Sequence, residues 1–99
     1  MNINIQSIHF DADQKLLDFT RSKIEKLETV FDKIVLVDVY LKFDSASSQI
    51  KEKTAEIKIQ IPGITLFSKE SNDNFEAAID EAVESMRRQL KKHKEKLKN

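Results

Sequence analysis

Residues 72–99 read NDNFEAAIDEAVESMRRQLKKHKEKLKN. This stretch constrains the fold, because its apolar residues need an apolar surface on the rest of the chain to pack against. Its apolar residues recur at intervals of three and four, which places them on one face of a helix. They are Phe75, Ile79, Ala82, Val83, Met86, Leu90 and Leu97. The spacing predicts a long amphipathic helix over about residues 73–98, with one apolar stripe laid against a core.

The charges of this predicted helix are sorted along its axis, with the acids first and the bases last. Residues 86–99 contain seven Lys or Arg and one acid, whereas residues 1–85 contain ten Lys or Arg and sixteen acids. The formal net charge of zero therefore comes from two opposite segments that cancel. This order suits the helix dipole. A segment as positive as the last one also points to an anionic partner, which could be nucleic acid, a membrane surface or an acidic protein.

The composition favours a single soluble globular domain in the cytoplasm. Hydrophobic residues make up 39% and charged residues 34% of the 99 residues, which is enough apolar content for one modest core. No apolar run approaches the roughly 20 residues of a membrane span, and the first residues lack the basic and then apolar order of a signal peptide. We therefore expect no membrane contact.

The residue types argue against an enzyme. There is no cysteine, which excludes a disulfide, a thiol nucleophile and a thiolate metal site. His9 and His93 lie far apart, and the sequence identifies no acid and nucleophile to complete a catalytic set with either. The acids Asp80 and Glu84 are better explained by compensation of the helix dipole than by paired-carboxylate chemistry. We expect no catalytic residue, no metal and no cofactor.

Alternation of apolar and polar residues predicts four strands, over residues 2–8, 34–43, 53–61 and 64–70. The second strand begins with the wholly apolar run IVLV, which predicts a central position in the sheet. Its expected buried residues are Val35, Val37, Val39, Leu41 and Phe43. Pro62 and Gly63 separate the last two strands and predict a tight hairpin.

A first helix is expected over about residues 13–31. Its apolar stripe is Leu16, Leu17, Thr20, Ile24, Leu27 and Phe31. Asp11 or Asp13 can cap this helix, and Ser71, Asn72 or Asp73 can cap the last one.

The resulting order, β-α-β-β-β-α, predicts an α+β fold with a four-stranded mixed sheet. The helix between the first two strands implies a right-handed crossover and parallel pairing, whereas the later strands can pair antiparallel. Alternating strands supply only one apolar face, so both helices should pack on the same face of the sheet.

Basic residues line the arc beside the apolar stripe of the last helix: Arg87, Arg88, Lys91, Lys94 and Lys98. Successive members lie about one turn apart and can follow a phosphate backbone, where each contact also releases a counterion. The other interpretation is a solvated helix end. Two features favour the first: few acids lie one turn away, and the first helix and its end offer a second basic border. These further basic residues are Lys15, Lys23, Lys26 and Lys33.

Three other side chains have a structural and a functional interpretation. His93 falls in the apolar arc, where a histidine at the edge of the core is the better explanation. Tyr40 and Phe67 can project from the open face of the sheet, as in RNA-binding sheets that stack bases on aromatic rings. The order of elements differs from that module, which weakens the second interpretation.

Four stretches resemble the ribosome hibernation-promoting factor family, which includes the ribosome-associated inhibitor once described as a sigma modulation protein. They are NINI at the start, RSKIEKLETVFDKI in the first helix, DNFEAAIDEAVESMRRQL, and the ending MRRQLKKHKEKLKN. The resemblance implies a β-α-β-β-β-α fold similar to a double-stranded-RNA-binding domain. It also implies binding to the small ribosomal subunit, in the channel of messenger and transfer RNA, which holds idle ribosomes inactive.

Matched position by position, the resemblance implies contacts to ribosomal RNA by basic residues of both helices. They are Lys23, Lys26, Arg87, Arg88, Lys91, Lys92 and Lys94, and the basic arc adds Lys98. Phe75 stands where the family often has tyrosine.

The chain resembles the short form of the family, because residues 1–99 contain neither a C-terminal dimerisation domain nor an acidic tail. We expect a single ribosome-binding domain that is monomeric in solution, with a ribosome-dimerising protein as a second partner. Promotion of ribosome pairing and a simple block of initiation both stay open. A structured-RNA-binding or protein-interaction module is the alternative function.

Overall fold

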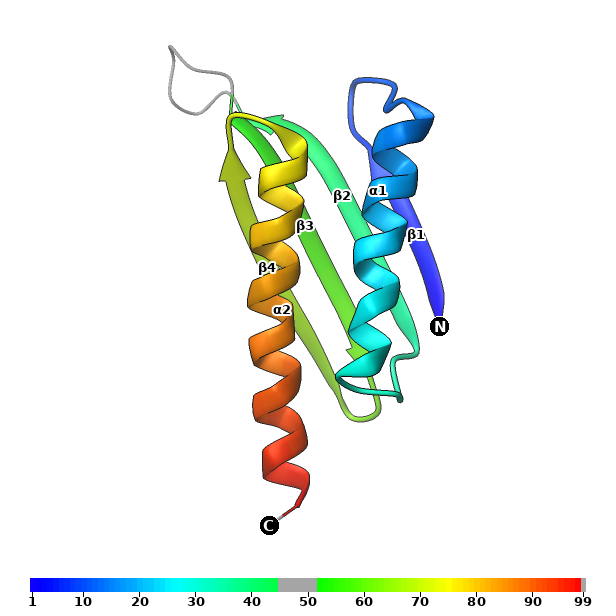
Figure 1. Cartoon of the computed structure of the whole chain (residues 1–99), viewed down its shortest axis with the longest axis vertical. Helices are drawn as coiled ribbons and strands as arrows, with labels where there is room; N and C mark the ends of the chain where they lie inside the picture. The colour runs from blue at the N-terminus through cyan, green and yellow to red at the C-terminus, as the bar shows by residue number, and fades with distance from the viewer. Residues whose placement is uncertain (45–51, 99) are drawn as a thin grey trace.

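The computed structural model describes residues 1–44 and 52–98. Its elements are β1 (Asn2–Ser7), α1 (Gln14–Glu25), the short 3-10 helix η1 (Lys26–Thr29), β2 (Leu36–Asp44), β3 (Glu52–Ile61), β4 (Ile64–Asn72) and α2 (Phe75–Leu97). Both helices lie side by side on one face of a four-stranded sheet, and both begin at the same end of the molecule (Figure 1). The predicted α+β fold is confirmed. The expected polar connection over residues 45–51 lies outside the described residues.

The sheet has the order β1-β2-β3-β4, so β2 is central, as the apolar run at its start predicted. β1 pairs parallel with β2, whereas β2 with β3 and β3 with β4 are antiparallel. Ile61 pairs with Ile64 on either side of the predicted hairpin. Gly63 has a φ of 84°, a left-handed conformation that glycine adopts without steric cost.

The core lies between the sheet and the two helices. The alternating residues of the central strands fill the sheet side and are at most 1% exposed: Val37, Val39, Leu41, Ala55, Ile57, Ile59 and Ile61. The stripe of α2 covers them with its buried residues: Phe75, Ala78, Ile79, Ala82, Val83, Met86 and Leu90. Thr20 of α1 is fully buried, and its hydroxyl donates to the Leu16 carbonyl at 2.8 Å, so burial leaves no unpaired donor.

The first helix is shorter than predicted. Its α-helical part ends at Glu25, and the chain tightens into η1, where both Val30 and Phe31 donate their N–H to the Leu27 carbonyl. This tightening brings Leu27, Val30 and Phe31 into the core together, at 0%, 8% and 6% exposure. Packing of these side chains explains why the α-helical spacing stops before residue 31.

The caps of the two helices were predicted with mixed success. Asp13, one of two candidates, caps α1 by accepting a hydrogen bond from the Leu16 N–H at 2.9 Å. None of the three candidates caps α2; the cap is Asn74, whose Oδ1 accepts from the Ala77 N–H at 2.7 Å. The physical reason is that β4 runs on to Asn72, which shifts the start of the helix.

Three apolar residues expected inside are exposed. Phe43, the last apolar residue of β2, is 42% exposed. Val35 precedes the start of β2 and is 51% exposed, because the strand begins two residues later than predicted. Leu97 is 64% exposed, because the last turns of α2 run past the β3–β4 hairpin and have no sheet beneath them (Figure 1). Leu90 is the last buried residue of the helix. We call residues 91–98, which are the end of α2 with its C-cap Lys98, the overhang.

Candidate nucleic-acid interface

The side of α2 that faces α1 carries a row of basic residues. Asp80 marks that side, because its Oδ1 lies 3.1 Å from Nζ of Lys23 on α1. Later residues at helical spacings of three and four return to the same side as Asp80. They are Arg87, Lys91, Lys94 and Lys98, and we call them the groove row.

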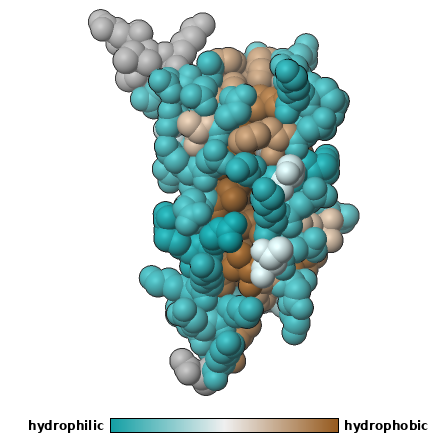
Figure 2. Space-filling view, viewed as in Figure 1, coloured by the Kyte–Doolittle hydropathy of each residue, from teal (hydrophilic) through white to brown (hydrophobic). Residues whose placement is uncertain are grey.

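Lys23 and Lys26 border the same gap from the other helix. Lys26 begins η1, three residues after Lys23, so the two side chains lie about one turn apart, and Lys26 is exposed. Between the two helices runs an apolar strip with hydrophilic side chains along both borders (Figure 2). The floor of the gap is therefore apolar, and its charges are on its rims.

Lys23 already has two partners in the structure. Its ammonium group pairs with Asp80 and lies 5.4 Å from the centre of the Phe19 ring. The side chains of Lys23 and Asp80 are 34% and 52% exposed. Ion pairs with this degree of solvent exposure contribute at most about 1 kcal/mol to the free energy of unfolding. A phosphate can therefore replace Asp80 as the partner of Lys23 at small cost.

The arginines have an acidic partner that the sequence analysis undervalued. Glu84 lies one turn before both, with its carboxylate 3.5 Å from Nε of Arg87 and 3.9 Å from Nη1 of Arg88. The expectation that the basic run has few acids one turn away is therefore wrong at its start. It fails because Glu84 stands at i,i+3 and i,i+4 from the two arginines, a spacing already readable in the sequence.

The overhang is where positive charge is least compensated. Lys91, Lys92, Lys94 and Lys98 are all exposed there. Within the described part of the chain, none of the four has an acidic oxygen within ion-pair distance. These four side chains are therefore accessible to an anionic polymer.

The predicted basic residues do not form one surface. Lys92 lines a depression on the other side of α2, toward β4, together with Ile64 and Leu66. Arg88 is 68% exposed, and it lines a second depression on the outer surface of α2 that also includes Lys91 and Lys92. Lys15 lies in the first turn of α1, at the end of the molecule far from the overhang (Figure 1). The groove row shares its side of α2 with Asp80, which pairs with Lys23 across the gap between the helices.

Phe75, which stands where the family often has tyrosine, is a core residue. It is 7% exposed and stacks on Phe10 with ring centres 5.0 Å apart, while Phe43 packs edge-on against both rings. A hydroxyl on this ring would have to reach out of an aromatic cluster. His93 likewise lies at the edge of the core, as expected, with its ring edge-on to Phe31 at 5.7 Å.

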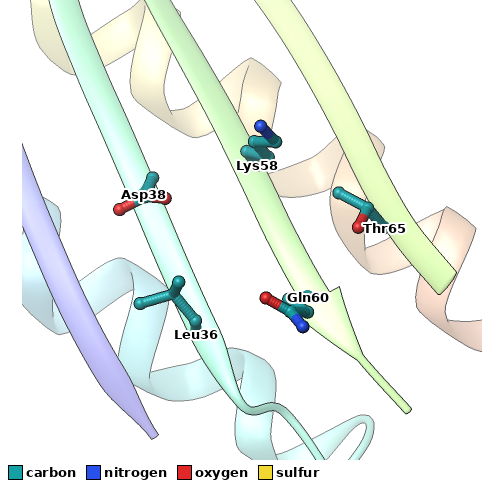
Figure 3. A pocket seen from close by; sticks show the side chains of 5 residues that line it. All are labelled: Leu36, Asp38, Lys58, Gln60 and Thr65. Atoms are coloured by element: carbon teal, nitrogen blue, oxygen red, sulfur yellow. The ribbon is translucent and has the colours of Figure 1, made fainter. Parts of the chain in front are cut away.

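The face of the sheet opposite the helices is polar and mixed in charge. Tyr40 pairs with Glu56, and Phe67 pairs with Lys58, so both rings project from this open face. Phe67 is 52% exposed. Beside it a shallow hollow is lined by Leu36, Asp38, Lys58, Gln60 and Thr65 (Figure 3). A carboxylate beside a single ammonium group gives this face no net attraction for a polyanion.

Residues 1–44 and 52–98 contain no group of three His, Cys, Asp or Glu side chains arranged to hold a metal ion. Over the same ranges, no helix is long and apolar enough to cross a membrane.

Comparison with known proteins places the chain in a family. The model of the sigma 54 modulation protein / S30EA ribosomal protein family matches residues 3–98. The chain belongs to this family. Among its members, the ribosome hibernation promoting factor of Pseudomonas putida is 35% identical over 96 residues, covering 97% of this chain and 89% of the relative. That of Escherichia coli K12 is 32% identical over 98 residues, covering 99% and 98%.

Solved structures share the fold of this family member. A ribosomal subunit interface protein from Coxiella burnetii superposes with a TM-score of 0.84 at 19% identity, covering 95% of this chain and 98% of that one. The N-terminal domain of Thermus thermophilus Protein Y gives 0.81 at 24% identity, covering 94% and 99%. At these identities the comparison concerns the fold, and it agrees with the sheet order and helix placement described above.

Proposed function

We propose that this protein binds the small ribosomal subunit in the channel of messenger and transfer RNA and holds the ribosome in an inactive, hibernating state. The observation that carries the proposal is the groove row, which lies on the side of α2 that pairs with Lys23 of α1 and has its uncompensated charges in the overhang. Relatives of matching length carry the name ribosome hibernation promoting factor, which supports the same function.

The chemistry of the proposed contact is electrostatic. The two basic rims can each approach phosphates, and every phosphate that they neutralise releases a counterion. The sites we assign to ribosomal RNA are the groove row with Lys23 and Lys26, and Arg88 and Lys92 at the flanks. The protein acts by occupying space, without catalysis or a cofactor. It works in the cytoplasm as a single ribosome-binding domain and a monomer, and a ribosome-dimerising protein is a further partner.

Competition on purified small subunits tests this proposal. Subunits are loaded with messenger and initiator transfer RNA, the protein is added, and the bound fraction is measured by sedimentation. Loaded subunits should retain much less protein than empty ones, and excess protein should slow initiation in a purified system. Equal binding to loaded and empty subunits would show that the protein sits elsewhere.

A further inference from the structure

A second surface lies on the side of α2 that faces away from α1. Here the start of β4 and the end of α2 enclose a shallow hollow lined by Ile64, Leu66, Gln89, Lys92, His93 and Lys96. Ile64 is 43% exposed, and Leu66 is half-buried. The floor of the hollow is thus apolar and open to solvent. Large aliphatic side chains that are exposed as a group indicate an interaction site.

The backbone beside this hollow is an open sheet edge. β4 is the last strand of the sheet, and the side-chain amide of Gln89 donates to the outward-pointing Phe67 carbonyl at 2.9 Å. In an antiparallel pair, a residue whose carbonyl points outward also points its N–H outward, and the same holds two residues away. The N–H groups of Thr65 and Phe67 and the Thr65 carbonyl therefore face outward. None of them has a hydrogen-bond partner among the described residues.

The charge around the hollow has one sign. Its charged lining residues are Lys92 and Lys96, both are exposed, and neither forms an ion pair within the described part of the chain. A partner that fits here must present an apolar group to the floor, a backbone to the edge and a negative charge to the rim. A nucleic-acid backbone supplies only the last of these.

We propose that this hollow and the adjoining edge of β4 bind an extended, acidic-aliphatic peptide segment of a partner protein. The segment adds as a further strand beside Thr65 and Phe67, a mode in which backbone hydrogen bonds give affinity and alternate side chains give specificity. One aliphatic side chain lies against Ile64 and Leu66, and a carboxylate lies near Lys92 or Lys96. The groove row faces the other way, so RNA held there leaves the edge of β4 and Lys96 open to this peptide, and Lys92 is the residue that both surfaces share.

Titration of the isotope-labelled protein with synthetic peptides, followed by amide NMR and hydrogen exchange, tests the proposal without ribosomes. The probes are a peptide that alternates Leu and Asp, one that alternates Leu and Lys, and one that alternates Ser and Asp. The Leu–Asp peptide should bind saturably, shift the signals of the hollow and slow exchange of the Thr65 and Phe67 amides. The other two peptides should bind much more weakly.

Three variants sharpen the result. Thr65→Pro removes the outward N–H at an edge position where proline is tolerated, and should abolish the exchange protection, while Thr65→Ala should keep it. Lys92→Glu with Lys96→Glu should weaken the Leu–Asp peptide by roughly fivefold. The matched pair Lys94→Glu with Lys98→Glu, on the groove row, should leave the peptide's affinity unchanged.

Four outcomes would overturn the proposal. They are the absence of saturable binding, shifts confined to the groove row, equal binding of the Ser–Asp peptide, and displacement of the Leu–Asp peptide by a short RNA. The last result would assign the hollow to nucleic acid.

Discussion

The two parts of α2 are built for different tasks, although they belong to one continuous helix of 23 residues. From Phe75 to Leu90 the helix lies on the sheet and buries its apolar stripe, and its first turns carry the acids. After Leu90 no residue of the helix is buried, and five of residues 91–98 are Lys. The first part holds the fold together, whereas the second is free to change its charge without disturbing the core.

The overhang is helical only because it continues the part of α2 from Phe75 to Leu90, which we call the supported part. An isolated peptide of this length is marginal as a helix in water, because the free energy needed to nucleate the helix exceeds the free energy gained by adding a few turns. Here the overhang continues a helix that is already nucleated and packed, and Lys, Glu and Leu are good helix formers. Its bases also lie at the C-terminal end, where they complement the helix dipole. A rigid basic rod is obtained without a core of its own.

The largest effect should come from a charge placed under the supported part. Ile79→Asp puts a carboxylate at a fully buried position and should cost several kcal/mol, enough to threaten a fold with a typical stability of about 5 to 15 kcal/mol. Leu97→Asp, at the 64% exposed position in the overhang, should shift the melting temperature very little. Thermal unfolding followed by circular dichroism compares them, and equal shifts would contradict the division of α2.

Next in size is the fall in ribosome affinity when the overhang is reversed in charge. Lys91→Glu with Lys94→Glu should lower affinity for small subunits by at least about tenfold, and flatten the plot of log affinity against log salt by about 0.7 to 0.9 for each phosphate that is no longer neutralised. Stability should change by less than about 0.5 kcal/mol, because both side chains are exposed. Lys58→Glu with Lys69→Glu, on the open face of the sheet, is the matched control. A folded double variant with parental affinity and salt slope would reduce the overhang to a solvated helix end.

A smaller effect is expected at the N-terminal cap of the supported part. Asn74→Ala removes the acceptor for the Ala77 N–H and should cost about 1 kcal/mol. For a domain of this size that corresponds to a fall in melting temperature of about 4 to 8 °C. Asp73→Ala, next to the cap, is the control and should cost much less. A larger destabilisation by Asp73→Ala would show that Asp73, one of the three candidates from the sequence, is the N-terminal cap of α2.

The smallest effect should come from the ion pair between the helices. Asp80→Asn releases Lys23 and should alter stability by at most about 1 kcal/mol, since the pair is wet. Affinity for small subunits should rise by up to about threefold, because Lys23 no longer has to leave a carboxylate. Asp11→Asn makes the same change of net charge just before α1, at the end of the molecule far from the overhang, and should leave affinity unaltered. A fall in affinity for Asp80→Asn would mean that this carboxylate positions Lys23 for RNA.

The sequence predicted the features that depend on periodicity. Strict alternation in residues 53–61 identified both the buried residues Ile57 and Ile59 and the exposed Lys58, since a strand presents alternate residues to opposite faces. The helical stripe identified the buried residues of α2 up to Leu90, except Ala78. Counting strands with one apolar face was enough to place both helices on the same side of the sheet.

Features that depend on where elements end relative to one another could not be predicted. Leu97 continues the stripe in sequence, yet the length of the sheet decides that nothing covers it. Asn74 is a cap only because β4 extends to Asn72. The pairing of Lys23 with Asp80 depends on the relative heights of two helices joined through three strands, which no local pattern contains. The distinction between the groove row and Lys92 required the same information.

The separation of acids and bases along the long axis also affects how the molecule arrives at a target. A protein with zero formal net charge gains no overall attraction toward a polyanion, but unlike poles at opposite ends give it a permanent dipole moment. In the field of a negatively charged particle such a molecule turns before it touches, with the overhang leading, so a larger share of collisions begins in a productive orientation. The zero net charge also limits non-specific binding to other nucleic acids, because they offer no site whose shape fits the oriented protein. Alignment of the protein's dipole, and not a positive net charge, thus makes its association with such a particle both rapid and selective.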